Sequence, residues 1–124
     1  MKMSIDEYNK IRGKGKSKYG SQRTEYNGMM FDSKKEADYA KNLESRRHAH
    51  ELNERVVRVE YQVPYPITAK NKIVSHYFAD FRITYADLHQ EVVDVKGGSA
   101  TKTALYRLKK KLVETLHSIE IKEV

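Results

Sequence analysis

The sequence contains no cysteine, and only two prolines and six glycines occur among its 124 residues. Without cysteine there can be no disulfide and no thiolate metal site, so zinc fingers and cysteine nucleophiles are excluded. Long apolar runs are also missing. No segment approaches the roughly 18 apolar residues of a membrane span, and the segment Met1 to Lys10 lacks the apolar stretch of a signal peptide. We therefore expect a cytoplasmic protein that does not bind a membrane.

Charge, by contrast, is abundant. Lys and Arg total 24 against 17 Asp and Glu, which gives a net charge of +7, while hydrophobic residues make up 39%. This length suits one compact domain, so any site must share the core that folds the chain. A positive field attracts nucleic acid or an anionic membrane, and the charge alone does not distinguish them.

The basic residues are concentrated at the start of the chain. Residues 2–24 contain seven Lys or Arg against two acidic residues, with three glycines and little apolar periodicity. This composition indicates a flexible basic arm over residues 1–22, followed by one domain over residues 23–124. Within the arm, the candidate nucleic-acid contacts are Lys14, Lys16 and Lys18.

Turn and capping signals divide the rest of the chain into short elements. Asn27-Gly28 is typical of a tight hairpin turn, and Ser33 with Glu36 has the spacing of a capping box, which predicts a helix from Lys34 to Asn53. Periodicity predicts three strands, over Val56–Val63, His76–Tyr85 and Glu91–Lys96. A second helix is predicted over Thr101–His117, with leucines 105, 108, 112 and 116 on one stripe. A last strand is predicted over Ile119–Ile121. This order predicts an α/β sandwich with a mixed central β-sheet flanked by helices.

Acidic residues interrupt two of the predicted strands. Asp80 lies between Ala79 and Phe81, and a charged residue inside an apolar strand destabilises it unless it is paired or bound to metal. In the next strand, Asp94 and Lys96 are two residues apart and leave the same face. Carboxylates on neighbouring strands suit Mg²⁺ or Mn²⁺, and a lysine beside them can offset charge on a phosphate. The pattern predicts phosphodiester hydrolysis.

Each of these residues also has a plainer interpretation. About two acid-x-lysine triplets are expected by chance at this composition, and the sequence has three. Asp94 and Lys96 would then form a solvated salt bridge on a strand. Glu36 is the expected capping partner of the backbone of Ser33. It also shares a helix face with Ala40 and Leu43, where its carboxylate can reach a metal site in the sheet.

The second predicted helix is strongly basic. Lys109 falls inside its apolar stripe, either as a snorkelling side chain at the edge of the core or as a cation that faces the scissile phosphate. The other candidate nucleic-acid contacts on this helix, which a solvated face would equally explain, are Lys102, Tyr106, Arg107, Lys110 and Lys111.

In four stretches, the sequence resembles a family of small phage endonucleases of the PD-(D/E)XK superfamily. The resemblance lies in the order and spacing of these stretches, which are YNGMMFDSKKEADYAKNLE, YFADFRITY, EVVDVKG and TALYRLKKKLVE. The resemblance spans roughly Ser17 to Val124. It implies the restriction-endonuclease sandwich and a Holliday junction resolvase-like enzyme that cuts branched DNA as a homodimer in phage recombination. Ala79 stands where the superfamily name expects proline, and Asp94 stands in place of glutamate.

The resemblance also assigns roles to individual residues. Asp80 and Asp94 would bind Mg²⁺ or Mn²⁺, the carbonyl of Val95 would add a ligand, Glu36 would supply the helix acid, and Lys96 would serve the nucleophile. The alternative is a DNA-binding or partner-binding phage accessory protein that kept this fold and lost catalysis.

Overall fold

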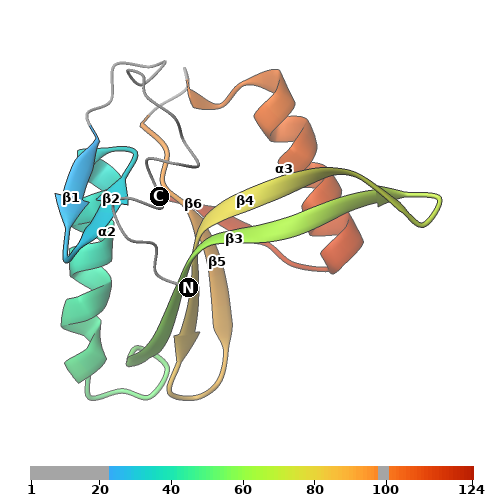
Figure 1. The fold of residues 1–124 in the computed structure, drawn as a ribbon. Helices are drawn as coiled ribbons and strands as arrows, with labels where there is room; N and C mark the ends of the chain where they lie inside the picture. Colours follow the sequence, from blue (N-terminus) through green and yellow to red (C-terminus); the bar gives the residue numbers. More distant parts are fainter. Residues whose placement is uncertain (1–22, 98–100) are drawn as a thin grey trace.

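The computed structural model describes residues 23–97 and 101–124 as an α/β arrangement with a mixed sheet and two helices (Figure 1). Its elements are β1 (Thr24–Tyr26), β2 (Met29–Phe31), α2 (Lys34–Ser45), a 3-10 turn (Arg46–His48), β3 (Val56–Ala69), β4 (Lys72–Tyr85), β5 (Gln90–Asp94), α3 (Ala104–His117) and β6 (Ile121–Glu123). The larger sheet has the order β3-β4-β5-β6, antiparallel except for the parallel pair β5-β6. The expected α/β class with a mixed sheet is confirmed. The predicted arm, with Lys14, Lys16 and Lys18, lies outside the described residues.

A separate hairpin of β1 and β2 opens the described chain, as predicted. Tyr26 pairs with Met29, which leaves Asn27 and Gly28 as the two turn residues. Their φ angles are 54° and 78°, the left-handed conformation that this type of turn requires at both positions. The hairpin packs Met29 and Phe31 into the core beneath α2.

Helix α2 begins at the predicted residue but ends earlier than expected. The Ser33 hydroxyl accepts a hydrogen bond from the Glu36 N–H at 3.1 Å and caps the helix. The helix ends at Ser45, with the 3-10 turn after it, so the prediction that it reaches Asn53 is wrong. Beyond the turn, the Arg55 guanidinium donates to the carbonyls of Ala49 and His50, at 2.8 and 3.1 Å. These bonds satisfy carbonyls that a longer helix would have paired internally.

Strands β3 and β4 are both longer than predicted. Strand β3 continues through Pro64 and Pro66 because it is the edge strand of the sheet, where a missing N–H on the open side removes no ladder bond. The two strands meet at Lys70 and Asn71, whose φ angles of 50° and 63° form a tight turn without glycine. The absence of a glycine signal explains why the sequence did not predict this turn.

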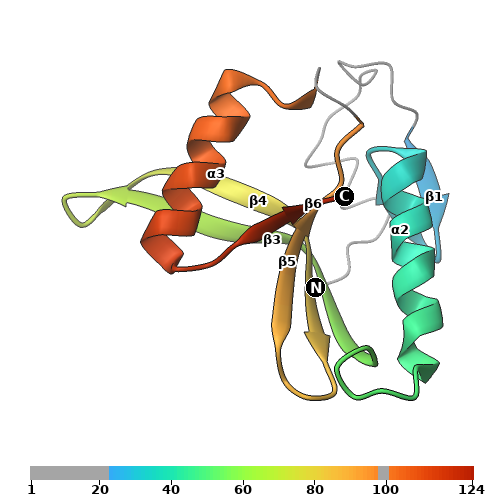
Figure 2. The same cartoon turned by 180° about the vertical axis from the view of Figure 1, so that it is seen from behind.

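The two helices pack on opposite faces of β5. Val93 contacts the core cluster that contains Leu43 of α2, whereas its neighbour Val92 belongs to the cluster that contains Val113 of α3. Since successive strand residues point to opposite faces, the sheet separates the helices at this strand, as Figure 2 also shows. None of the described helices is long and apolar enough to span a membrane.

Helix α3 does not pack through its leucines. We expected leucines 105, 108, 112 and 116 to face the core, but 39–62% of each is exposed, and Val113 is the buried residue of the helix. The apolar packing of Val113 and polar contacts on the same side of the helix hold it instead. Lys110 lies 3.8 Å from Glu123, and His117 hydrogen-bonds the Pro66 carbonyl at 2.8 Å. These contacts turn the leucine stripe about a quarter turn away from the sheet.

Candidate functional site

Asp80 and Asp94 lie side by side on neighbouring antiparallel strands. The register pairs Phe81 with Val93, so the next residues along, Asp80 and Asp94, also face each other. The Asp80 N–H donates to Asp94 Oδ1 at 2.9 Å, and the Val95 N–H donates to Asp80 Oδ2 at 2.9 Å. Each carboxylate is therefore fixed by the backbone of the opposite strand, which gives the site a rigid base.

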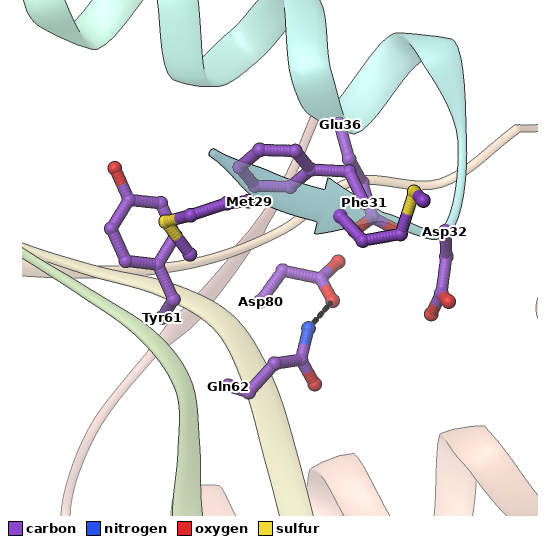
Figure 3. A pocket seen from close by; sticks show the side chains of 8 residues that line it. Met29, Phe31, Asp32, Glu36, Tyr61, Gln62 and Asp80 are labelled. Atoms are coloured by element: carbon purple, nitrogen blue, oxygen red, sulfur yellow. Dashed lines mark hydrogen bonds between the residues drawn. The ribbon is translucent and has the colours of Figure 1, made fainter. Parts of the chain in front are cut away.

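Glu36 reaches the same site from α2. Only 7% of the residue is exposed, and its carboxylate lies above Asp80 (Figure 3). Ser33 provides the cap through its side chain, while the Glu36 carboxylate accepts a backbone hydrogen bond from Asp32. Glu36 is thus a buried acid that faces the sheet, which is the arrangement expected of a third site carboxylate.

Asp32 is a fourth acid that the sequence did not predict. It follows β2 and lines, with Glu36 and Asp80, a cavity of about 20 Å³, enough for one water molecule or one ion. The rest of the wall is mostly apolar: Met29, Met30, Phe31, Tyr61 and Gln62. In the sequence, Asp32 is distinguished only by forming one of the three acid-x-lysine triplets, with Lys34. We call Asp32, Glu36, Asp80 and Asp94 the carboxylate cluster.

Gln62 is another site residue that sequence reasoning missed. Its Nε2 donates to Asp80 Oδ1 at 3.2 Å, and its φ angle of 48° is left-handed within a strand. Such backbone strain is rare for a residue other than glycine and is often found at functional sites. No sequence signal identifies it, because a glutamine in a strand carries no pattern.

Burial raises the pKa values of Asp32, Glu36 and Asp94, and repulsion from neighbouring acids of the cluster adds to this effect at Asp32 and Glu36. Desolvation, and then the charges of Asp80 and Asp32, raise the pKa of Glu36 to about 9. Desolvation, and then Asp80, raise the pKa of Asp32 to about 6. Desolvation also raises the pKa of Asp94, which Lys96 partly offsets. At neutral pH the cluster therefore holds a proton on Glu36, and a bound cation would relieve the same repulsion.

The donor set fits a hard divalent cation in its chemistry. Carboxylate oxygens are the ligands that Mg²⁺ and Mn²⁺ take, and the carboxylates of Asp32, Glu36 and Asp80 line a cavity of the right size. In the described part of the chain, however, no group of three or more His, Cys, Asp or Glu side chains is already arranged to hold a metal ion. Metal binding would thus require the side chains of Glu36 and Asp32 to close on the fixed pair Asp80 and Asp94, and Glu36 to lose its proton.

Lys96 lies at the edge of the cluster, where β5 has ended. Its Nζ is 3.9 Å from the centroid of the Tyr106 ring. Its charge lowers the pKa values of Glu36 and Asp94, so the ammonium group lies within electrostatic range of both acids. The Lys96 carbonyl accepts a hydrogen bond from Lys35 Nζ at 2.5 Å, which adds a second cation that the sequence did not indicate.

The predicted nucleic-acid contacts on α3 and the segment before it divide into two groups. The first group lies on the side of the carboxylate cluster, around Glu123. The ammonium groups of Lys102 and Lys110 lie 3.7 and 3.8 Å from the Glu123 carboxylate, and the Tyr106 hydroxyl donates to it at 2.8 Å. Lys109 reaches the His76 carbonyl at 3.5 Å, in agreement with a snorkelling side chain. Two further residues are exposed, Arg107 and Lys111. The structure therefore brings only part of the predicted track close to the cluster.

Fold and site together define a small α/β protein with four acids and a lysine at the junction of a mixed sheet and two helices. Residues 16–123 match the family described as "Protein of unknown function (DUF1064)", and the chain belongs to that family. No curated protein matches the sequence.

Proposed function

We propose that this protein is a metal-dependent DNA endonuclease that hydrolyses phosphodiester bonds at the carboxylate cluster. The observation that carries the proposal is the interlocked pair Asp80 and Asp94, with Glu36 buried above them and the Lys96 ammonium beside them. Burying like charges costs folding free energy, and function is the usual reason for keeping such a cluster. The PD-(D/E)XK likeness of the sequence agrees with these residues in these positions.

Each side chain has a separate task in the proposed reaction. Asp80, Asp94 and Glu36, with the Val95 carbonyl, would hold Mg²⁺ or Mn²⁺, and Asp32 is a further candidate ligand. When bound, the ion would supply a Lewis acid for the scissile phosphate. Lys96 stabilises negative charge that develops on the phosphate oxygens and orients the attacking water. The backbone bonds from Asp80 and Val95 keep the carboxylates in place during turnover.

The proposed substrate is branched DNA, in phage recombination or DNA processing. The net charge of +7 favours binding of a polyanion, and the lysines near Glu123 offer phosphate contacts next to the cluster. The restriction-endonuclease sandwich and a homodimer belong to the same proposal, since two symmetric cuts at a junction need two sites. Light scattering with and without DNA tests the dimer.

The testing experiment is cleavage of plasmid and four-way-junction DNA by the purified full chain. We expect nicking with Mg²⁺ or Mn²⁺ and none with EDTA. Asp80→Asn should reduce cleavage at least a hundredfold while DNA binding, measured by fluorescence anisotropy, is kept, because the substitution removes a charge and not a phosphate contact. Full activity of D80N would overturn the assignment.

A DNA-binding or partner-binding accessory protein without catalysis is the second candidate. The raised pKa of Glu36 and the lack of an assembled three-ligand group in the described residues favour it. In that case DNA binding would be measurable, and neither Mg²⁺ nor Mn²⁺ would produce any cleavage at any pH.

A further inference from the structure

Lys96 is held against an aromatic face. Its Nζ lies 3.9 Å from the centroid of the Tyr106 ring, well inside the roughly 6 Å range over which a cation is attracted to the negative face of a ring. The ammonium also lies within electrostatic range of the carboxylates of Glu36 and Asp94, whose pKa values it lowers. The ring contact therefore holds the head group close enough to the carboxylate cluster to act on two of its acids.

The ring of Tyr106 is itself fixed by its surroundings. The Tyr106 N–H donates to the Thr103 hydroxyl that caps α3, at 3.1 Å. Its own hydroxyl donates to Glu123 Oε2 at 2.8 Å, and its ring packs 6.2 Å from that of Tyr77. A side chain anchored at both ends makes a rigid surface in the first turn of the helix.

We propose that Tyr106 is a positioning residue that fixes the Lys96 ammonium beside the carboxylate cluster. A lysine side chain has four rotatable bonds, and holding it in one direction costs conformational entropy. The fixed ring offsets part of that cost before substrate arrives. The catalytic consequence rests on the proposed function, whereas the contact between the two side chains does not.

The contact is tested first without any activity measurement. Protons above an aromatic ring resonate upfield, so we expect the ε-methylene protons of Lys96 upfield of those of other lysines in a ¹H–¹³C spectrum of the full chain. Tyr106→Leu should abolish this shift, and Tyr106→Phe should keep it because the ring remains. A Lys96 resonance that does not move in Y106L would overturn the proposal, whether or not the protein cleaves DNA.

Tyr26 and Lys41 supply a matched control, since Lys41 Nζ lies 5.4 Å from the centroid of the Tyr26 ring, outside the carboxylate cluster. Tyr26→Leu should move the Lys41 resonance, leave that of Lys96 in place and leave cleavage unchanged. Y106L should move Lys96 and leave Lys41 in place. Thermal unfolding of each variant confirms that the comparison is made on folded protein.

Kinetics then separate positioning from direct DNA contact. If the cation–π contact between Lys96 and Tyr106 acts fully in the cleavage step, its loss should decrease the rate of DNA cleavage by about 2- to 30-fold. We expect Y106L to lose that factor in kcat with little change in KM, and Y106F to recover most of it. A raised KM with unchanged kcat would instead make Tyr106 a DNA contact and contradict the positioning role. If the wild-type protein cleaves no DNA, the proposed function fails, while the Lys96 resonance still decides the contact.

Discussion

Replacing Glu36 by glutamine should make the stability of the protein less dependent on pH. Burial and two neighbouring acids raise the pKa of this carboxyl from 4.5 to about 9. The folded state thus keeps a proton that the unfolded chain releases above pH 4.5. Glu36 makes its full contribution to the free energy of unfolding below pH 4.5. This contribution is lost as the pH rises toward 9, because in that range the unfolded state binds fewer protons than the folded state. Glutamine has no proton to lose.

The expected size follows from the proton count. A difference of one bound proton changes the free energy of unfolding by about 1.4 kcal/mol per pH unit. Between pH 6.5 and 8.0, above the pKa of about 6 of Asp32, Glu36 alone should therefore remove about 2 kcal/mol from the wild type. Glu36→Gln should not show this loss, so its stability relative to the wild type should rise by about that amount.

Urea denaturation in metal-free buffer at several pH values measures the effect. Glu25→Gln is the matched control, since Glu25 is an exposed residue on the β1-β2 hairpin and its removal should leave the pH dependence of the wild type unchanged. Parallel stability curves for the wild type and E36Q would refute the reasoning, since they would mean that Glu36 is already ionised at pH 6.5.

Three further predictions concern metal binding and packing. Mg²⁺ binding should release a proton near pH 7.5, because Glu36 must ionise to become a ligand. Calorimetry in two buffers of different ionisation enthalpy would detect the released proton as a difference in binding heat. Equal binding heats in the two buffers would contradict the prediction. Tyr77→Phe should stabilise the protein by about 1 kcal/mol in urea denaturation, because the buried Tyr77 hydroxyl has no hydrogen-bond partner among the described residues; a loss of stability would reveal a partner. Leu108→Gln should change stability by less than about 0.5 kcal/mol, whereas Val113→Ala should cost about 2 kcal/mol; the reverse order would mean that the leucine stripe is buried.

The parts of the fold that local chemistry determines could be predicted from the sequence. Asn27-Gly28 requires a turn with two positive φ angles, and Ser33 supplies a cap oxygen at a fixed spacing, so the hairpin and the start of α2 follow from neighbouring residues. The convergence of Asp80 and Asp94 was also predictable, since alternation along two adjacent strands places both on one face. Their metal-binding role stays a prediction.

The parts that long-range contacts determine could not be predicted. The end of α2 depends on Arg55, which binds carbonyls five and six residues before it. The continuation of β3 through its prolines depends on its place at the sheet edge. Asp32 joins the site only because the hairpin lies beneath α2. The leucine stripe did not predict the buried face of α3 for the same reason, since Val113 packs against the sheet and Lys110 and His117 make contacts on that side.

The central claim is that Asp94 belongs to a working hydrolytic site, and single-turnover cleavage of a labelled four-way junction by Asp94→Asn tests it most directly. We predict metal-dependent cleavage by the wild type, a loss of at least a hundredfold in D94N at unchanged DNA affinity, and full activity in E25Q. Equal cleavage by D94N and the wild type, or no cleavage by the wild type with either Mg²⁺ or Mn²⁺, would contradict the account.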